Sequence, residues 1–489
     1  MKAPPSDEKA PARLEGTDAG SNQTRQNSTT QPGLGKEIDL AVALGVEKFP
    51  DYYHAPSERY LVRNRAGRWN PFSAGPYKKI LIERGLDPTV EKGVLLSDCD
   101  LAAIAVQSEN DVSASGALCG RNAGFIEENG TRFLVTENMN LIDPVEGECE
   151  AVVAVLGGLF KDRENAVIGQ AQIHTFLGWL QSSVVALRTG RQQQQQVLVI
   201  CGPKDCGKSF LQHLIITPCL AGRSADAKRA FLNDNQFNAD LYKAEHLFLD
   251  DCRASTSIRD RLTLGGHLKT HTVGASINSL HGKGKDAINI RPWWRITIPL
   301  NDDPESILIL PPLNEDIADK IILLRASLFD FPDPIGTADE KARFASKIRE
   351  GLPAFIHWLL YTYKIPEAYA DPRRYNIATF QHPNLVETLE GLSPEAELLD
   401  LINLVMKEDF KHGPIWITAE KLEERIRAEY ERRATQIFTY RQACGKYLHR
   451  LSVKRPDRVA KSRTGQANGW NLIPKPVDSM EGVEGESLF

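Results

Sequence analysis

The residues with the clearest chemical potential lie between Gly202 and Ser209, where the sequence has the spacing Gly-x-x-x-x-Gly-Lys-Ser. The two glycines allow the backbone to curl so that successive N–H groups point inward and can bind phosphate oxygens. Lys208 would reach the β- and γ-phosphates, and the Ser209 hydroxyl would hold Mg²⁺. The pattern predicts an ATP site with contacts from Gly202, Pro203, Lys204, Asp205, Cys206, Gly207, Lys208, Ser209 and Phe210.

The segments on either side of this turn favour the same interpretation. The apolar, β-branched run 197–201 predicts a buried parallel strand. Leu211, Leu214 and Ile215 have helical spacing and predict a helix that begins at the turn. The alternative is a glycine-rich loop without a ligand. The order of strand, turn and helix favours a nucleotide site, because the helix N-terminus adds a dipole that attracts anions.

Two further apolar segments end in polar side chains. Residues 246–249 predict a second buried strand, and Asp250 and Asp251 follow it directly. In a nucleotide site, Asp250 would bind the metal through water and Asp251 would orient or deprotonate the attacking water. Residues 293–301 predict a third strand, at whose end Asn301 could reach the γ-phosphate and that water. The alternative for the Asp pair is a capping role at the strand end.

A basic loop lies between the second and third predicted strands. In residues 279–290, His281, Lys283 and Lys285 alternate with glycines, and a strand follows. Two glycines predict a flexible tip. The residues alone leave two interpretations open, a solvated loop and a contact with nucleic acid.

Composition limits the class of protein. The chain has 489 residues, 42% hydrophobic and 25% charged, which is typical of a soluble protein of two to four domains. The net charge of −5 means that any nucleic-acid surface must be local. Eight cysteines without CxxC or Cys/His ligand spacing predict reduced thiols and no zinc ribbon. No apolar run reaches the roughly 18 residues of a membrane span, and no signal peptide is seen, so we expect a cytoplasmic protein.

The order of these parts resembles the superfamily 3 helicases, a branch of the AAA+ ATPases that includes papillomavirus and polyomavirus helicases and the helicase parts of phage, plasmid and poxvirus primase–helicases. The resemblance covers about residues 165–400 and lies in the motif order. It implies a P-loop ATPase core built on a parallel sheet, and a ring, expected to be a hexamer. It also implies that a hairpin lysine, often beside a histidine, grips single-stranded DNA in the channel. The matching positions are His281, Lys283 and Lys285.

The resemblance also implies a cationic finger that acts on the ATP of a neighbouring subunit. Residues 316–325 are similar to the family's Asp-x-x-x-Arg-Arg segment, but Lys320 stands where arginine is usual. A lysine is a poorer planar clamp for a phosphoryl group. Arg325, Arg295 and Lys320 are therefore all candidates. Residues 352–360 resemble the family's lid helix, with Pro353-Ala354 in place of Pro-Gly.

The C-terminal part predicts a winged helix-turn-helix. Helices are expected at 395–407, 418–433 and 439–451, followed by a strand–turn–strand at 452–473. Between Arg441 and Arg463 there are eight Lys or Arg residues and one acid. This charge favours duplex DNA over a purely oligomerising role. Expected contacts are Arg441, Lys446 and Arg450 on the third helix, and Arg458, Lys461 and Arg463 on the wing.

The predicted fold class is α/β, with a small α/β domain before the AAA+ core and a winged helix after it. We expect a disordered arm at 1–37, an accessory domain at 38–160, the ATPase domain at 161–365, a linker at 366–390, the winged helix at 391–475 and an acidic tail at 476–489. In the accessory domain, residues 58–69 and 124–135 predict hairpins, the second with a turn at Asn129-Gly130.

The predicted function is an ATP- and Mg²⁺-dependent DNA helicase or translocase in the replication of a phage, plasmid or mobile element. Its partners would be single-stranded and duplex DNA, further copies of the chain, and a separate primase or polymerase. The alternative is an AAA+ switch that controls assembly on DNA or on a partner protein without unwinding. A small-molecule kinase is disfavoured, because it has no use for a basic winged helix.

Overall fold

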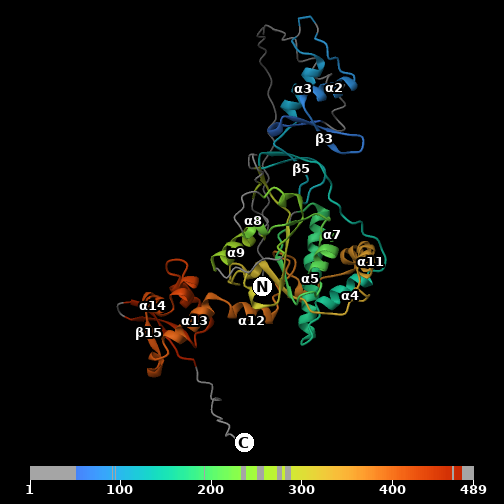
Figure 1. Cartoon of the computed structure of the whole chain (residues 1–489). Coiled ribbons are helices and arrows are strands. Elements are labelled where there is room, and N and C mark those ends of the chain that lie inside the picture. Colours follow the sequence, from blue (N-terminus) through green and yellow to red (C-terminus); the bar gives the residue numbers. More distant parts are fainter. Residues whose placement is uncertain are drawn as a thin grey trace, which may run out of the picture.

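The computed structural model describes residues 51–90, 92–93, 95–191, 193–232, 238–250, 258–272, 278–280, 288–464 and 467–475. The predicted N-terminal arm and acidic tail lie outside these residues, as do residues 38–50. Within the described part, no helix is long and apolar enough to cross a membrane. Figure 1 shows a central sheet with its helices, an N-terminal unit in blue and a C-terminal unit in orange and red.

A five-stranded parallel sheet forms the centre of the fold, in the order β14-β8-β13-β10-β9. Its strands are β8 (Val197–Gly202), β9 (Ser224–Asp226), β10 (His246–Phe248), β13 (Arg295–Asn301) and β14 (Ile321–Arg325). Every residue of β8 is buried, as the continuous apolar run predicts for a strand covered on both faces. Because the strands are parallel, the ends of β8, β10 and β13 meet at one edge of the sheet.

Helices cover both faces of this sheet. They are α4 (Glu150–Leu159), α5 (Ala166–Thr189), α6 (Lys208–Leu211), α7 (Thr217–Cys219), α8 (Lys228–Leu232), α9 (Ile258–Thr272), α10 (Pro304–Ile307) and α11 (Ala338–His357). Figure 1 shows α4, α5 and α11 on one side of the strands and α8 and α9 on the other. A π-helical turn, Gln212–Ile216, joins α6 to α7. The mixed α/β class with a parallel sheet is therefore confirmed.

The N-terminal unit contains two small sheets. The first, in the order β3-β2-β1-β4, packs with α2 (Ala74–Glu83) and α3 (Asp98–Glu109); the second has the order β5-β7-β6. The strands are β1 (Tyr52–His54), β2 (Arg59–Arg63), β3 (Trp69–Phe72), β4 (Asp111–Val112), β5 (Ala114–Gly116), β6 (Gly124–Glu128) and β7 (Thr131–Val135). Both predicted hairpins are confirmed. Asn129 and Gly130 both have positive φ, at 53° and 74°, which a two-residue turn of type I′ requires.

The C-terminal unit has a hydrophobic core of its own, formed by residues between Leu398 and Leu472. It comprises α13 (Pro394–Val405), α14 (Ala419–Ile437), α15 (Ala443–Lys454) and the antiparallel sheet β15-β17-β16. The strands are β15 (Ile415–Ile417), β16 (Val459–Thr464) and β17 (Ala467–Leu472). Thr418 caps α14, as predicted, by accepting a hydrogen bond from the Lys421 backbone N–H. Whether this unit works as a winged helix stays a prediction.

Two boundaries differ from the sequence prediction. The third helix of the C-terminal unit, α15, is predicted to begin at 439 but begins at Ala443. Its N-cap is Gln442, which has a left-handed φ of 72°. The predicted linker 366–390 includes most of α12 (Pro383–Gly391). Leu385 and Leu389 of α12 are buried in the central core, so this stretch packs as part of the fold.

Candidate nucleotide site

The turn after β8 has the backbone that its glycines permit. A Cβ at Gly202 would lie 2.6 Å from the Ala326 carbonyl oxygen, so a side chain there would force the backbone apart. Gly207 has a φ of 102°, a conformation that L side chains rarely adopt, and forms the N-cap of α6. These two glycines therefore allow the chain to leave β8, curl, and begin α6 at Lys208.

Three elements bring their polar side chains together at this edge of the sheet. Asn301 ends β13 and pairs in register with Gly202, the last residue of β8. The Lys208 Nζ atom donates to the Gly202 and Pro203 carbonyl oxygens at 2.8 and 2.7 Å, and lies 3.4 Å from the Asn301 Oδ1 atom. Asp250 follows β10, the next strand beyond β13, and lines the same cavity as Lys208 and Asn301.

This cavity has a volume of about 850 Å³. Its lining includes eight of the predicted site residues: Lys204, Asp205, Gly207, Lys208, Ser209, Phe210, Asp250 and Asn301. Gly202, Pro203 and Cys206 are not in the lining. Cys206 is 1% exposed, and burial raises the pKa of its thiol, so this side chain packs beneath the turn. Asp251, the predicted base, lies outside the described residues.

The other half of the cavity comes from residues that the sequence analysis did not identify. Phe331 and Ile335 follow β14, and Lys341 and Phe344 lie on α11. The Phe210 and Phe344 rings stack at a centroid distance of 5.5 Å, and Phe331 contacts both rings edge-on at 5.8 Å. Nothing in the local sequence distinguishes these phenylalanines from core residues, or Lys341 from an ordinary surface lysine of an amphipathic helix.

The residues present fit a Mg²⁺ ion in part. The described residues contain no group of three or more His, Cys, Asp or Glu side chains that could hold a metal alone. The Ser209 hydroxyl and the Asp250 carboxylate line the same cavity, which Asp205 and Ser306 also line. This donor set suits Mg²⁺, which keeps several waters and completes its shell with phosphate oxygens.

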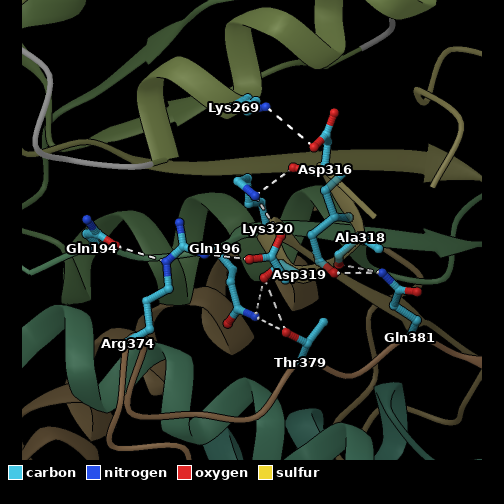
Figure 2. Close-up of polar contacts among 11 residues, drawn as sticks. Gln194, Gln196, Lys269, Asp316, Ala318, Asp319, Lys320, Arg374, Thr379 and Gln381 are labelled. Atoms are coloured by element: carbon cyan, nitrogen blue, oxygen red, sulfur yellow. Dashed lines mark hydrogen bonds and ion pairs between the residues drawn. The ribbon is translucent and has the colours of Figure 1, made fainter. Parts of the chain in front are cut away.

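Two candidates for a finger acting on a neighbouring subunit are wrong, because both are buried. Lys320 is 7% exposed and its Nζ atom donates to the Asp316 carbonyl and the Asp319 carboxylate, both at 2.6 Å (Figure 2). It precedes β14 and so lies at the opposite end of the sheet from Lys208. Arg295 is 4% exposed and donates to the Ser183 hydroxyl at 2.9 Å. Burial lowers the pKa of Arg295 to about 10.

Arg325 is half-buried at the end of β14. It lines a separate cavity of about 220 Å³, together with Pro203 and Asp302. Arg325 is therefore close to the glycine-rich turn of its own chain but outside the larger cavity. Among the three finger candidates, it is the one that is not buried.

The predicted DNA-contacting histidine and lysines, His281, Lys283 and Lys285, lie outside the described residues. On either side of them, β11 (Asn278–Leu280) and β12 (Ile288–Ile290) pair antiparallel, with Leu280 opposite Ile288. The strand that was expected after the loop is confirmed. The strands on the two sides of segment 281–287 are therefore paired with each other.

The basic residues of the C-terminal unit do not form one surface. Arg458 is 3% exposed and its Nε atom donates to the Ile473 carbonyl at 3.0 Å, so its prediction as a DNA contact is wrong. Arg450 is ion-paired with Glu395 at 2.8 Å. Arg441 precedes α15 and does not lie on it. Lys461 and Arg463 on β16 are exposed.

Acidic side chains oppose the remaining basic residues near α15. Arg441, Lys446 and Arg450 line a cavity of about 770 Å³ whose lining also includes Glu420, Glu423 and Glu424 of α14. Carboxylates repel phosphate, so this cavity is a poor place for a duplex backbone. Lys461 and Arg463 on β16 are exposed and do not line this cavity.

No protein-family model matches the chain, and no curated protein matches it either. Solved structures with a similar arrangement include an apo structure of the NrS-1 C-terminal region, with 15% identity, a TM-score of 0.49, and coverage of 89% of this chain and 99% of that chain. The SCCmec type IV Cch active helicase has 9% identity, a TM-score of 0.28, and coverage of 83% and 73%.

An inhibitor-bound JCV helicase has 14% identity, a TM-score of 0.26, and coverage of 52% of this chain and 61% of that chain. At TM-scores below 0.5 and these identities, the similarities assign neither a family nor a function to the chain.

Proposed function

We propose that the chain is an ATP-dependent DNA helicase or translocase that works as a hexameric ring in the replication of a phage, plasmid or mobile element. One observation carries the proposal. Lys208, Ser209, Asp250 and Asn301 come from three parts of the chain and line one cavity beside a glycine-rich turn. A cation, a hydroxyl, a carboxylate and an amide are the groups that phosphoryl transfer requires.

Each residue has a separate part in hydrolysis. Lys208 would exchange its two carbonyl partners, Gly202 and Pro203, for the β- and γ-phosphate oxygens and neutralise charge there. Ser209 and Asp250 would hold Mg²⁺, which when bound would further neutralise the phosphates. Asp251 would take the proton of the attacking water, and Asn301 would orient that water or the γ-phosphate.

The apolar half of the cavity suits the base of the nucleotide. Aromatic rings of Phe210, Phe331 and Phe344 lie within 6 Å of one another, and Ile335 lies beside them. A base has a π-face that can stack on such rings. The volume of about 850 Å³ falls within the range of roughly 300–1,000 Å³ that is usual for small-molecule sites. A nucleoside triphosphate therefore suits both halves of the cavity.

The channel hairpin is the part of the proposal that separates a translocase from a switch. Replacing Lys283 and Lys285 together by Ala is expected to leave basal ATP turnover and assembly unchanged, because neither lysine belongs to the motif that predicts the phosphate contacts. Stimulation by single-stranded DNA and unwinding of a forked duplex should both fall to background. Both are measured with the wild type in parallel.

The control for this experiment removes two lysines elsewhere. Lys243 and Lys364 are exposed and line none of the three cavities described above. Their double replacement by Ala should leave unwinding intact. Normal unwinding by the hairpin variant contradicts the channel assignment. A switch that does not thread DNA predicts that DNA stimulation survives in the hairpin variant.

Duplex DNA is proposed to contact the C-terminal unit through Lys461 and Arg463. Replacing both by Ala should weaken duplex binding by the intact chain and reduce the slope of log affinity against log salt by about 1.8, since each neutralised phosphate contributes about 0.9. Arg455 and Lys411 are paired with Asp457 and Glu408 at 2.7 and 2.5 Å, so their double replacement is the control. An unchanged slope in the first variant favours a protein partner for this unit.

The proposal includes an accessory domain at 38–160 and a separate primase or polymerase as partner. Arg325 is the proposed finger, because Lys320 and Arg295 are buried.

A further inference from the structure

Four buried polar side chains form a chain of hydrogen bonds behind the nucleotide site. Gln212, His246 and Thr297 are 0% exposed, and Thr217 is 7% exposed. The Gln212 Nε2 atom donates to the Thr297 hydroxyl at 2.7 Å. The His246 ring bonds the same hydroxyl through Nε2 at 2.8 Å and the Thr217 hydroxyl through Nδ1 at 2.7 Å.

Gln212, His246 and Thr297 each lie on or next to an element that carries or leads to a proposed site residue. Gln212 directly follows α6, which begins with Lys208 and Ser209. His246 begins β10, which leads to Asp250. Thr297 lies on β13, which ends at Asn301. The Thr297 hydroxyl on β13 forms hydrogen bonds with Gln212 and His246. It therefore connects β13 to β10 and to the turn that follows α6.

The backbone that begins at Gln212 is irregular. Residues Gln212–Ile216 form a π-helical turn between α6 and α7. Such turns are rare, occur mostly as single turns inside α-helices, and are frequent at functional sites. Here the turn starts at the residue whose side chain reaches Thr297, so the irregular backbone and the buried hydrogen bonds coincide.

Stability alone does not explain these polar groups. The Gln212 Oε1 atom is buried without a hydrogen-bond partner in the part of the chain that the structure describes. A buried polar atom without a partner is destabilising, and apolar side chains of similar shape would avoid this cost. What the polar groups provide is directional contact, which fixes the distance and orientation between the elements they join.

His246 has no role in proton transfer to the substrate. Burial lowers the pKa of His246 to about 3, and nearby His213 acts in the same direction. The ring is therefore neutral near pH 7, when one nitrogen donates and the other accepts. A neutral, buried ring that touches two threonines and does not line the cavity is suited to holding elements in place.

We propose that Thr297, with Gln212 and His246, positions the phosphate-binding helix relative to the two strands that carry Asp250 and Asn301. This inference rests on the proposed nucleotide site. Thr297 touches no substrate, so it is a positioning residue. The hydroxyl would keep the Lys208 end of α6 in register with Asn301 while the nucleotide binds and reacts.

Replacing Thr297 by Val removes the hydroxyl and keeps the shape. We expect kcat for ATP to fall on the order of ten- to a hundredfold, with KM within about threefold, because misplacement of reacting groups by about 1 Å can cost this much. Thr297→Ser keeps the hydroxyl and should restore kcat to within about threefold of the wild type. Both are measured by steady-state ATP turnover.

Two further variants separate positioning from stability. Gln212→Met has similar volume and removes the Oε1 atom that lacks a partner, so it should fold at least as stably as the wild type but still lose kcat. Arg295 lies on β13, the strand that also carries Thr297, and its Nε atom donates to the Ser183 hydroxyl. Ser183→Ala removes this acceptor and leaves the hydrogen bonds of Thr297 in place. It should lower the melting temperature and leave kcat near the wild-type value.

Amide hydrogen exchange of residues 208–217 gives a readout that does not depend on turnover. Faster exchange in Thr297→Val and Gln212→Met, but not in Ser183→Ala, is expected. Wild-type kcat and exchange in both variants would overturn the inference, as would equal losses of kcat in Ser183→Ala and Thr297→Val. If the wild type itself hydrolyses no nucleotide, the proposed function fails, and the exchange result still decides whether the hydrogen bonds hold the helix.

Discussion

Replacing Lys208 by Ala is expected to abolish nucleotide hydrolysis, with a loss of more than about a thousandfold, because the β- and γ-phosphates lose their cation. The Nζ atom now bonds two carbonyls of the turn, Gly202 and Pro203, and lies beside Asn301, so it is already at the mouth of the proposed phosphate site. Turnover and nucleotide affinity are both measured, and both should collapse.

Lys204 provides the comparison for this variant. It is exposed in the same turn and lines the same cavity, but the motif uses its backbone N–H group and not its side chain to contact phosphate. Lys204→Ala should therefore cost far less than Lys208→Ala. Equal losses would mean that the cavity needs positive charge in general, and undiminished turnover by Lys208→Ala would contradict the site.

Replacing Asp251 by Asn should slow hydrolysis by orders of magnitude and leave ATP binding largely intact, because the amide cannot accept the proton of the attacking water. Asp251 follows Asp250, which lines the cavity. Single-turnover hydrolysis and binding of a fluorescent ATP analogue separate the two steps. Unlike Asp251→Asn, the Asp250→Asn variant should change how ATP turnover depends on the Mg²⁺ concentration. Normal turnover by Asp251→Asn would transfer the role of base to another residue.

Much of the fold could be predicted because its signals are local. The continuous apolar run of β8 indicates a buried strand without reference to the rest of the chain. Asn129-Gly130 specifies a tight turn through its positive φ angles, and Thr418 specifies a helix start through its hydroxyl. The glycine-rich turn belongs to the same group, since Gly202 and Gly207 are required by a close backbone contact and by a positive φ.

The predictions that were wrong concern the exposure of charged side chains, which depends on tertiary packing. Lys320, Arg295 and Arg458 are charged, and charged residues are mostly exposed. Each is buried here because a specific partner accepts its hydrogen bonds: Asp319 for Lys320, Ser183 for Arg295 and the Ile473 carbonyl for Arg458. Ser183 is 112 residues from Arg295 and Ile473 is 15 residues from Arg458, so no local pattern identifies these two partners. Asp319 is next to Lys320 in the sequence, but this proximity alone does not indicate burial.

The apolar side of the cavity could not be predicted for a related reason. Phe331 and Phe344 resemble core residues in sequence, and Lys341 resembles a surface residue. They reach the cavity because α11 folds back toward the turn after β8, which only the three-dimensional arrangement defines. The polar site residues at strand ends could be predicted from the sequence, because parallel strands place their carboxyl ends at one edge of the sheet.

The most direct test of the central claim is the ATP turnover of the intact wild-type chain with Mg²⁺, measured with and without single-stranded DNA. A DNA translocase should hydrolyse ATP and do so several-fold faster when single-stranded DNA is present. Turnover that single-stranded DNA does not change, at any chain concentration that supports assembly, would contradict the account.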